Sequence, residues 1–210
     1  MKTHAQYSRG VMMVGAVLSL AFLLGACSSA SIPRFGVGGK YEEGRDQFFR
    51  GKGGDVDKAV DALEFVVSKD PTYKNSMTYL GRAYYRKGRY RDAYAILQRA
   101  LAINNDDEIA WIAIGATELR LGQDQKGIES LKGGITLASK VITQGYLNYP
   151  YWDLRGVVRS SIRRTAFLIT KGLDDKEELI RSTDLLLARI DDEENFQRNT
   201  RIQNTNNLYQ

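Results

Sequence analysis

Residues capable of nucleophilic or metal chemistry are scarce in this chain. Of its 210 residues, one is a histidine, His4, and one is a cysteine, Cys27. The chain beyond Cys27 therefore contains neither side chain, which excludes from it Ser-His-Asp and Cys-His catalysis, histidine or cysteine zinc sites, iron–sulfur clusters and intramolecular disulfides. Hydrolysis by a carboxylate pair, such as Glu118 with Asp124, is the enzyme chemistry that stays open.

The acidic run Asp191-Asp192-Glu193-Glu194 supplies oxygen ligands of the kind that calcium prefers. It lacks the alternating ligand positions and the turn glycine of a calcium loop. We interpret it as a solvated charge run, and we expect the chain to use no metal and no cofactor.

Cys27 follows a segment with the layout of an export signal. Lys2 and Arg9 precede an apolar run over residues 11–26, and no acid interrupts it. The run is shorter than the ~20 residues that a membrane-spanning helix needs. We expect residues 1–26 to be a signal peptide. Its removal lowers the net charge from +5 to about +3, which is weak for a nucleic-acid-binding protein, and we expect no nucleic-acid partner.

The end of this segment, Leu24-Gly25-Ala26-Cys27, resembles the lipobox of bacterial lipoproteins. The resemblance implies cleavage before Cys27, diacylglycerol on its thiol and attachment to the membrane through this lipid. Ser28 stands where an inner-membrane retention signal would place Asp, so the resemblance implies the outer membrane, with the chain facing the periplasm. Residues 27–39, rich in serine and glycine, are predicted to form the lipidated end of a flexible tether.

An internal repeat with a period of 34 residues follows the tether. Small and apolar residues recur at this spacing in four columns, which are Gly54, Gly88 and Gly122; Ala59, Ala93 and Gly127; Leu63, Leu97 and Leu131; and Val67, Leu101 and Ile135. A repeat of this length is typical of helix pairs that stack to complete a core.

The pattern resembles the tetratricopeptide repeat, W-x2-L-G-x2-Y followed by A-x3-F and P. The second copy has Met77-x2-Leu80-Gly81-x2-Tyr84, Ala93-x3-Leu97 and Asn105; the third has Trp111-x2-Ile114-Gly115; the first has Ala59-x3-Leu63 and Asp70-Pro71. The first copy's opening helix departs from the pattern and is followed by extra residues at 51–53. The resemblance covers residues 40–141 and implies an all-α fold, a short helical solenoid of about three helix pairs.

We expect helices near 41–50, 55–69, 74–87, 90–103, 108–121 and 124–140. Gly88 and Gly122 are predicted to end the first helix of a pair, because glycine accepts left-handed backbone angles.

In this family the first helix of each pair lines a concave groove that binds peptides. The positions that the resemblance carries over are Asn75, Thr78, Arg82, Tyr85 and Arg86 in the second copy, and Ile109, Ile112, Ala116 and Leu119 in the third. The first set suits an acidic or extended peptide segment, although two arginines one helical turn apart, like Arg82 and Arg86, are more often a solvated pair. The second set is apolar and needs a cover, either a partner or, as we favour, the chain's own C-terminal helices.

Residues 142–203 lose the repeat. They begin with an aromatic connector containing Tyr146, Tyr149, Tyr151 and Trp152, and continue as a helix pair, with Leu154 on the apolar face of a first helix over 153–171. Arg155, Arg159 and Arg163 form a basic stripe, which could bind lipid headgroups or an acidic protein but more often pairs with acids of the same domain. The polar tail, 204–210, is predicted to fray.

Together these features predict a lipid-anchored adaptor of the bacterial envelope that binds other envelope proteins and supports a membrane, secretion or pilus complex. An adaptor or regulator of peptidoglycan enzymes is the alternative. We do not expect an enzyme; a carboxylate-based hydrolase is the weaker reading.

Overall fold

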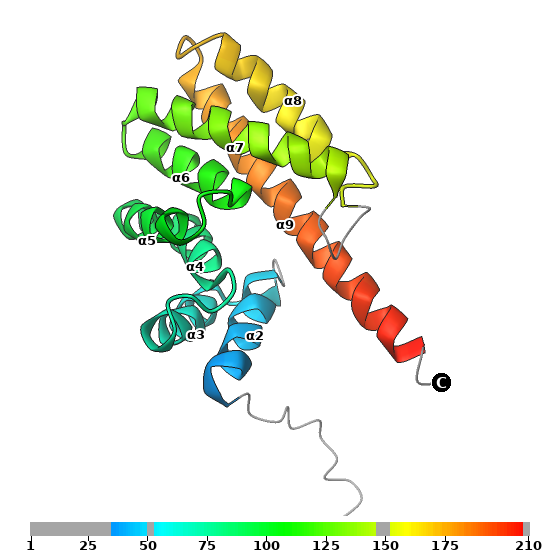
Figure 1. The fold of residues 1–210 in the computed structure, drawn as a ribbon. Helices are drawn as coiled ribbons and strands as arrows, with labels where there is room; N and C mark the ends of the chain where they lie inside the picture. Colours follow the sequence, from blue (N-terminus) through cyan, green and yellow to red (C-terminus); the bar gives the residue numbers. More distant parts are fainter. Residues whose placement is uncertain (1–34, 50–52, 146–151, 208–210) are drawn as a thin grey trace, which may run out of the picture. The chain divides into compact units, whose positions relative to one another are not determined.

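Helices form almost all of the chain that the computed structural model describes, residues 35–49, 53–145 and 152–207 (Figure 1). No strand occurs among these residues, so the predicted all-α fold is confirmed for them. The helices are α2 (Gly36–Phe49), α3 (Val56–Lys69), α4 (Ser76–Arg86), α5 (Tyr90–Ile103), α6 (Glu108–Arg120), α7 (Asp124–Gln144), α8 (Val157–Thr170) and α9 (Lys176–Asn207).

The first six of these helices form three successive pairs, α2 with α3, α4 with α5, and α6 with α7, and each pair packs on the next. A fourth pair, α8 with α9, follows them (Figure 1). This is the predicted solenoid of three pairs with a C-terminal helix pair. Helix α7 runs on to Gln144, past the predicted end at 140, and two boundaries of the predicted segments differ as well. Helix α2 takes in residues 36–39 of the predicted tether, and the helical backbone of α9 runs past 203 to Asn207.

A glycine on the first helix of each pair packs directly against a leucine of the second helix. A Cβ atom on Gly44, Gly81 or Gly115 would lie 2.5–2.8 Å from the Cγ atom of Leu63, Leu97 or Leu131, respectively. All three leucines are fully buried. Such distances are too short for a side chain, so glycine at this position sets how closely the two helices of a pair approach.

Gly44 explains why the first copy departs from the repeat in sequence. It lies three positions earlier than the 34-residue period would place it, and the extra residues at 51–53 fill that difference. Its contact with Leu63 is nevertheless the contact that Gly81 and Gly115 make. The first pair is therefore a complete repeat with a longer turn.

The turns between paired helices use the glycines that the sequence indicated. Gly88 and Gly122 have φ angles of +71° and +76°, in the left-handed region that glycine adopts at little cost. The amide of Gly88 donates to the Tyr85 carbonyl at 2.9 Å, and that of Gly122 to the Leu119 carbonyl at 3.1 Å. These bonds satisfy carbonyl groups that the ends of α4 and α6 would leave free.

Helix α8 starts later than predicted because a buried carboxylate fixes its first turn. Asp153 is fully buried, has a φ angle of +57°, and accepts hydrogen bonds from the amides of Val158 and Arg159, both at 2.9 Å. The chain turns at residues 152–155 instead of being helical there. Leu154, predicted to lie on the apolar face, is consequently outside the helix and 75% exposed.

Within the described ranges, every helix is too short or too polar to cross a membrane.

The glycine contact predicts a position-specific effect on stability. A Cβ atom on Gly115 would lie 2.9 Å from the Leu131 amide nitrogen and 3.0 Å from the Gly127 carbonyl oxygen, which are backbone atoms that cannot rotate away. We expect Gly115→Ala to lower the free energy of unfolding by about 1–3 kcal/mol, as measured by chemical denaturation.

Gly133 provides the matched control, because it is an exposed glycine within α7 whose Cβ atom would meet nothing within 4 Å. We expect Gly133→Ala to raise stability by about 0.5–1 kcal/mol, since alanine is the better helix former. Equal effects of the two substitutions would contradict the close helix approach at Gly115.

Candidate functional site

Helix α9 lies along the face formed by the first helices of the three repeats, so the chain itself occupies the predicted groove. It packs on α6 and α2, and its acidic side chains bond to α4 (Figure 1). At the far end of this contact, Arg198 of α9 forms an ion pair with Asp46 of α2. One helix thus bonds or packs against all three repeats.

The apolar side of α9 makes it a part of the core. Leu179, Leu186 and Ile190 are fully buried. Exposing a side chain of this size costs roughly 1.5–3 kcal/mol. Displacing α9 would expose several of them together, so a peptide that competes for the groove would have to replace a large apolar contact. The groove is therefore filled in the folded chain.

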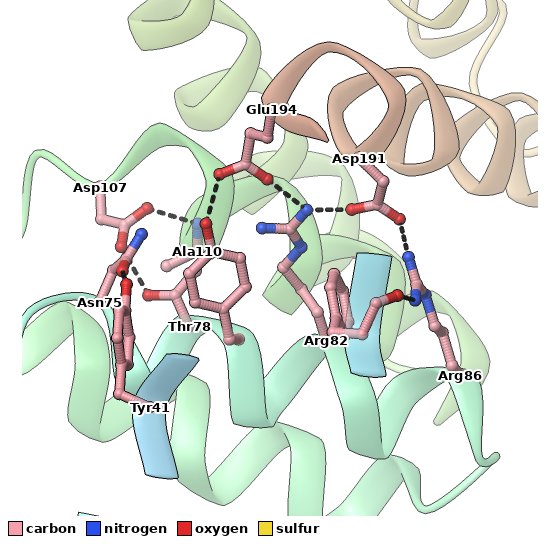
Figure 2. Close-up of polar contacts among 11 residues, drawn as sticks. Tyr41, Asn75, Thr78, Arg82, Arg86, Asp107, Ala110, Asp191 and Glu194 are labelled. Atoms are coloured by element: carbon pink, nitrogen blue, oxygen red, sulfur yellow. Dashed lines mark hydrogen bonds and ion pairs between the residues drawn. The ribbon is translucent and has the colours of Figure 1, made fainter. Parts of the chain in front are cut away.

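Arg82 is the centre of the polar contact between α4 and α9 (Figure 2). Its side chain is only 3% exposed, and its Nη2 atom donates to Asp191 and, at 2.7 Å, to Glu194. Burial alone lowers the pKa of Arg82, but the nearby carboxylates of Glu194 and Asp191 outweigh it and raise the pKa above its usual value. The guanidinium stays charged, and its charge is balanced by α9.

Aromatic rings complete the surroundings of this guanidinium. The Arg82 Cζ atom lies 5.0 Å from the ring centroid of Phe48 and 5.2 Å from that of Tyr79, within the range of cation–π attraction. The Tyr79 hydroxyl donates to Glu194 at 3.0 Å. Arg82 Nη1 is buried and has no hydrogen-bond partner among the described residues.

Arg86 extends the same contact toward the first repeat. It pairs with Asp191, donates to the Phe48 carbonyl oxygen at 2.7 Å, and places its Cζ atom 3.7 Å from the Phe48 ring centroid. Arg82 and Arg86 therefore share one carboxylate of α9 (Figure 2). The prediction of a solvated pair is wrong for Arg82, which is buried, whereas Arg86 stays partly in contact with solvent. Neither arginine is a free binding site, because both pair with Asp191.

A second cluster, around Asp184 about two turns before Asp191 on α9, joins α4 to α6. The Tyr85 hydroxyl donates to Asp184, and Arg120 pairs with the other oxygen of Asp184 at 2.6 Å. A cavity of about 340 Å³ lies between the two clusters and is lined by residues of both. Each of its three arginines, Arg82, Arg86 and Arg120, has a carboxylate partner on α9.

The remaining polar groove positions make contacts between neighbouring repeats. Asn75 accepts a hydrogen bond from the Tyr41 hydroxyl of α2, and Thr78 donates at 2.6 Å to Asp107, the residue that caps α6 (Figure 2). Asp107 also accepts from the Ala110 amide at 2.8 Å. These side chains hold the spacing between successive first helices.

The apolar strip of the third repeat is covered within the chain. Its members Ile109, Ile112, Ala116 and Leu119 are all buried. Helices α7 and α9 both pack on α6. The backbone nitrogen of Ile112 would lie 2.7 Å from a Cβ atom on Gly134, so the structure places Ile112 at the contact with α7.

The interpretation of residues 191–194 as a solvated charge run was wrong. Glu193 is fully buried, and the side chains of Asp191 and Glu194 are each only 14% exposed to solvent. Glu193 accepts from the Asp153 amide at 3.1 Å and from Arg155 at 2.9 Å, which ties the start of α8 to α9. Of the four acids, Asp192 is the exposed one, at 61%.

A spacing signal for the groove acids does exist in the sequence. Asp184 and Asp191 are seven residues apart, and Glu194 follows three later, so all three share one face of a helix beside the apolar positions Leu187 and Ile190. Sequence reasoning missed this face because it treated four adjacent acids as one group.

The basic stripe is divided between paired and unpaired residues. Arg155 pairs with Glu193, and Arg159 lies 3.9 Å from Asp153. Arg163 is exposed and has no ion pair within the described part of the chain. In the connector, Trp152 is buried, whereas Tyr146, Tyr149 and Tyr151 lie outside the described residues, as do Cys27 and the predicted signal peptide.

The carboxylates considered for hydrolysis both have structural partners. Glu118 is 1% exposed, accepts from the Ser130 hydroxyl at 2.6 Å and lies 3.3 Å from Lys126. Asp124 pairs with Lys176 at 2.5 Å. No group of three or more acidic, histidine or cysteine side chains that could hold a metal ion occurs among the described residues.

Residues 52–116 match the tetratricopeptide repeat. The match spans α3, α4 and α5 and reaches into α6. A comparison with curated proteins gave no match.

Tetratricopeptide repeats present surfaces to other proteins, which makes this chain a protein-interaction module with a helical-solenoid fold. Here the concave face of the repeats is covered by α9. The surfaces left for a partner therefore lie outside the contact between α4 and α9.

The buried Arg82 predicts a large loss of stability when its charge is removed. In Arg82→Met, the carboxylates of Asp191 and Glu194 would lose the guanidinium that balances them. We expect the free energy of unfolding to fall by about 3 kcal/mol or more, as measured by urea denaturation. Arg91→Met, an exposed arginine of α5, is the control and should change stability by at most about 0.5 kcal/mol. Similar effects of the two substitutions would rule out the buried ion pair.

The tyrosines that contact α9 predict instability at alkaline pH. Burial is the main cause that raises the pKa values of Tyr79 and Tyr85, and the carboxylates of Glu194 and Asp184 add to it. An unfolded tyrosine loses its proton near pH 10. Because the folded chain holds these protons to higher pH, the contribution of the two tyrosines to stability should be complete below about pH 10 and should be lost as the pH rises above it.

Denaturation midpoints at neutral pH and above pH 10 would measure this loss. In Tyr85→Phe one ionising group is gone, so the midpoint should depend less steeply on pH over the alkaline range. An unchanged pH dependence in this variant would show that Tyr85 does not contribute.

Proposed function

We propose that this chain is a lipid-anchored adaptor of the bacterial envelope, which holds another protein close to the outer membrane. No bond-making chemistry is needed for such a role. The match of residues 52–116 to the tetratricopeptide repeat is the observation that carries the protein-binding part.

The bracing of the repeats by α9 supports the adaptor role physically. A surface that is rigid before it binds loses less conformational entropy on binding, and so keeps more of its interaction free energy as affinity. The ion pairs of Arg82 and Arg120 with acids of α9, and of Arg198 on α9 with Asp46 of α2, join the repeats into one packed unit. A partner would meet a preformed surface.

The sequence motif around Cys27 supports the anchoring part. Two or more acyl chains would give stable attachment without a membrane-spanning helix, at about 0.8 kcal/mol for each buried methylene. The membrane is therefore expected to hold the chain through Cys27, with the repeats projecting into the periplasm.

Substitutions at two adjacent residues test the anchor and its destination separately. In a Gram-negative host, Cys27→Ser should abolish the incorporation of labelled palmitate and move the chain from the membrane to the soluble fraction. Ser28→Asp should keep the label but shift the chain from outer- to inner-membrane fractions on a density gradient. Ser29→Ala, which alters neither motif position, is the control.

A Cys27→Ser chain that stays in the membrane pellet after washing without detergent would refute lipid anchoring. The adaptor role is tested by crosslinking in intact membranes followed by mass spectrometry. One envelope complex should be recovered with the anchored chain and lost with Cys27→Ser; recovery of nothing reproducible from the anchored chain would count against an adaptor.

A further inference from the structure

A groove with a volume of about 480 Å³ lies between α7 and α8 and shares no lining residue with the α4–α9 contact. Its lining combines two arginines, two hydroxyl side chains and two isoleucines, which are Arg159, Arg163, Ser139, Thr143, Ile142 and Ile162. No acidic residue is among these lining residues. The groove is therefore basic at its rim and partly apolar inside.

Both arginines are available to a ligand. Arg163 is exposed and has no ion pair within the described residues. Arg159 is 48% exposed, and its Nε atom lies 3.9 Å from Asp153, at the limit of an ion pair. Asp153 already accepts two backbone hydrogen bonds at 2.9 Å, which are the shorter contacts. Arg159 could turn toward a ligand without leaving Asp153 unsatisfied.

The arginines of the α7–α8 groove differ from those of the α4–α9 contact in their partners. There, Arg82, Arg86 and Arg120 all have a carboxylate partner from α9. In the α7–α8 groove two arginines stand four residues apart on one helix face, and the lining contains no acid. Among the described residues, Arg159 has only the 3.9 Å contact with Asp153, and Arg163 has no ion pair. The two guanidinium groups are thus free to bind carboxylates of another molecule.

We propose that the α7–α8 groove is the partner-binding surface of this module, and that it takes an acidic segment of another protein; this rests on the protein-binding function proposed above. Arg159 and Arg163 bind two carboxylates of the segment, because guanidinium groups form paired hydrogen bonds with carboxylates. Ile142 and Ile162 contact an apolar side chain of the same segment.

The shape of the groove favours a protein segment over a membrane surface. Ile162 is buried at 5% exposure and Ile142 is partly buried, so the apolar atoms recede behind the arginines. Residues that insert into a bilayer must protrude from the surface. A receding apolar floor between charged rims instead fits a side chain that enters it from a peptide.

Two peptides serve as probes for the full-length chain purified in detergent. One is a fluorescein-labelled amphipathic peptide of glutamate, leucine and alanine; in the other, glutamine replaces glutamate. Fluorescence anisotropy should show binding of the acidic peptide and not of the neutral one. Binding should weaken as salt is raised, because charge attraction between exposed groups is screened.

Arg159→Glu with Arg163→Glu should weaken binding of the acidic peptide by about tenfold or more, since attraction becomes repulsion at both positions. The matched control is Arg91→Glu with Arg99→Glu, two exposed arginines of α5 that change the net charge equally. The control variant should keep its affinity within about twofold, the size expected for screened charges far from the site. Circular dichroism would verify that both variants are folded.

Three results would overturn the proposal. Equal weakening in both variants would indicate attraction to net charge alone. Binding to phosphatidylglycerol vesicles that depends on Arg159 and Arg163, without peptide binding, would make the groove a lipid site. A dimer lost only in the groove variant, again without peptide binding, would make it a self-association surface. Lipid attachment at Cys27 is measured separately, so failure of peptide binding leaves the anchor test intact.

Discussion

A buried positive charge is the constraint on which the arrangement of this molecule depends. Arg82 lies inside the stack of repeats, where an uncompensated guanidinium would be very costly. Asp191 and Glu194 of α9 provide the compensation, and Phe48 and Tyr79 surround it with aromatic rings. The position of α9 follows from this requirement together with the burial of its leucines. A helix from the end of the chain thus becomes part of the second repeat.

The sequence was informative wherever contacts are local and repeat with the period of the chain. The columns of Leu63, Leu97 and Leu131, and the turns at Gly88 and Gly122, depend on neighbours within one helix pair, and all were predicted correctly. The long α9 and the late start of α8 were predicted less well. The reason is that Asp153 and Glu193, which set the start of α8, are 40 residues apart and belong to no repeat.

The candidate site could be predicted in part. Family resemblance indicated which side chains of α4 face the groove, and Arg82, Arg86 and Tyr85 do face a polar surface there. The partners of that surface were not predicted, because the sequence alone does not show whether an acid on α9 is solvated or pairs with an arginine. Only the fold brings Asp184, Asp191 and Glu194 to the arginines. Only the fold, too, shows that no acid of the described segments pairs with Arg163.

Helix α9 also changes how the repeats should unfold. In an ordinary solenoid each repeat contacts only its neighbours, so its ends can fray while the middle persists. Here Arg198 bonds to Asp46, 152 residues earlier, and Arg82 bonds to carboxylates more than 100 residues later. These long-range bonds link the first repeat to the last helix. They convert a linear array into a closed, cooperative unit, in which the loss of either end removes support from the whole.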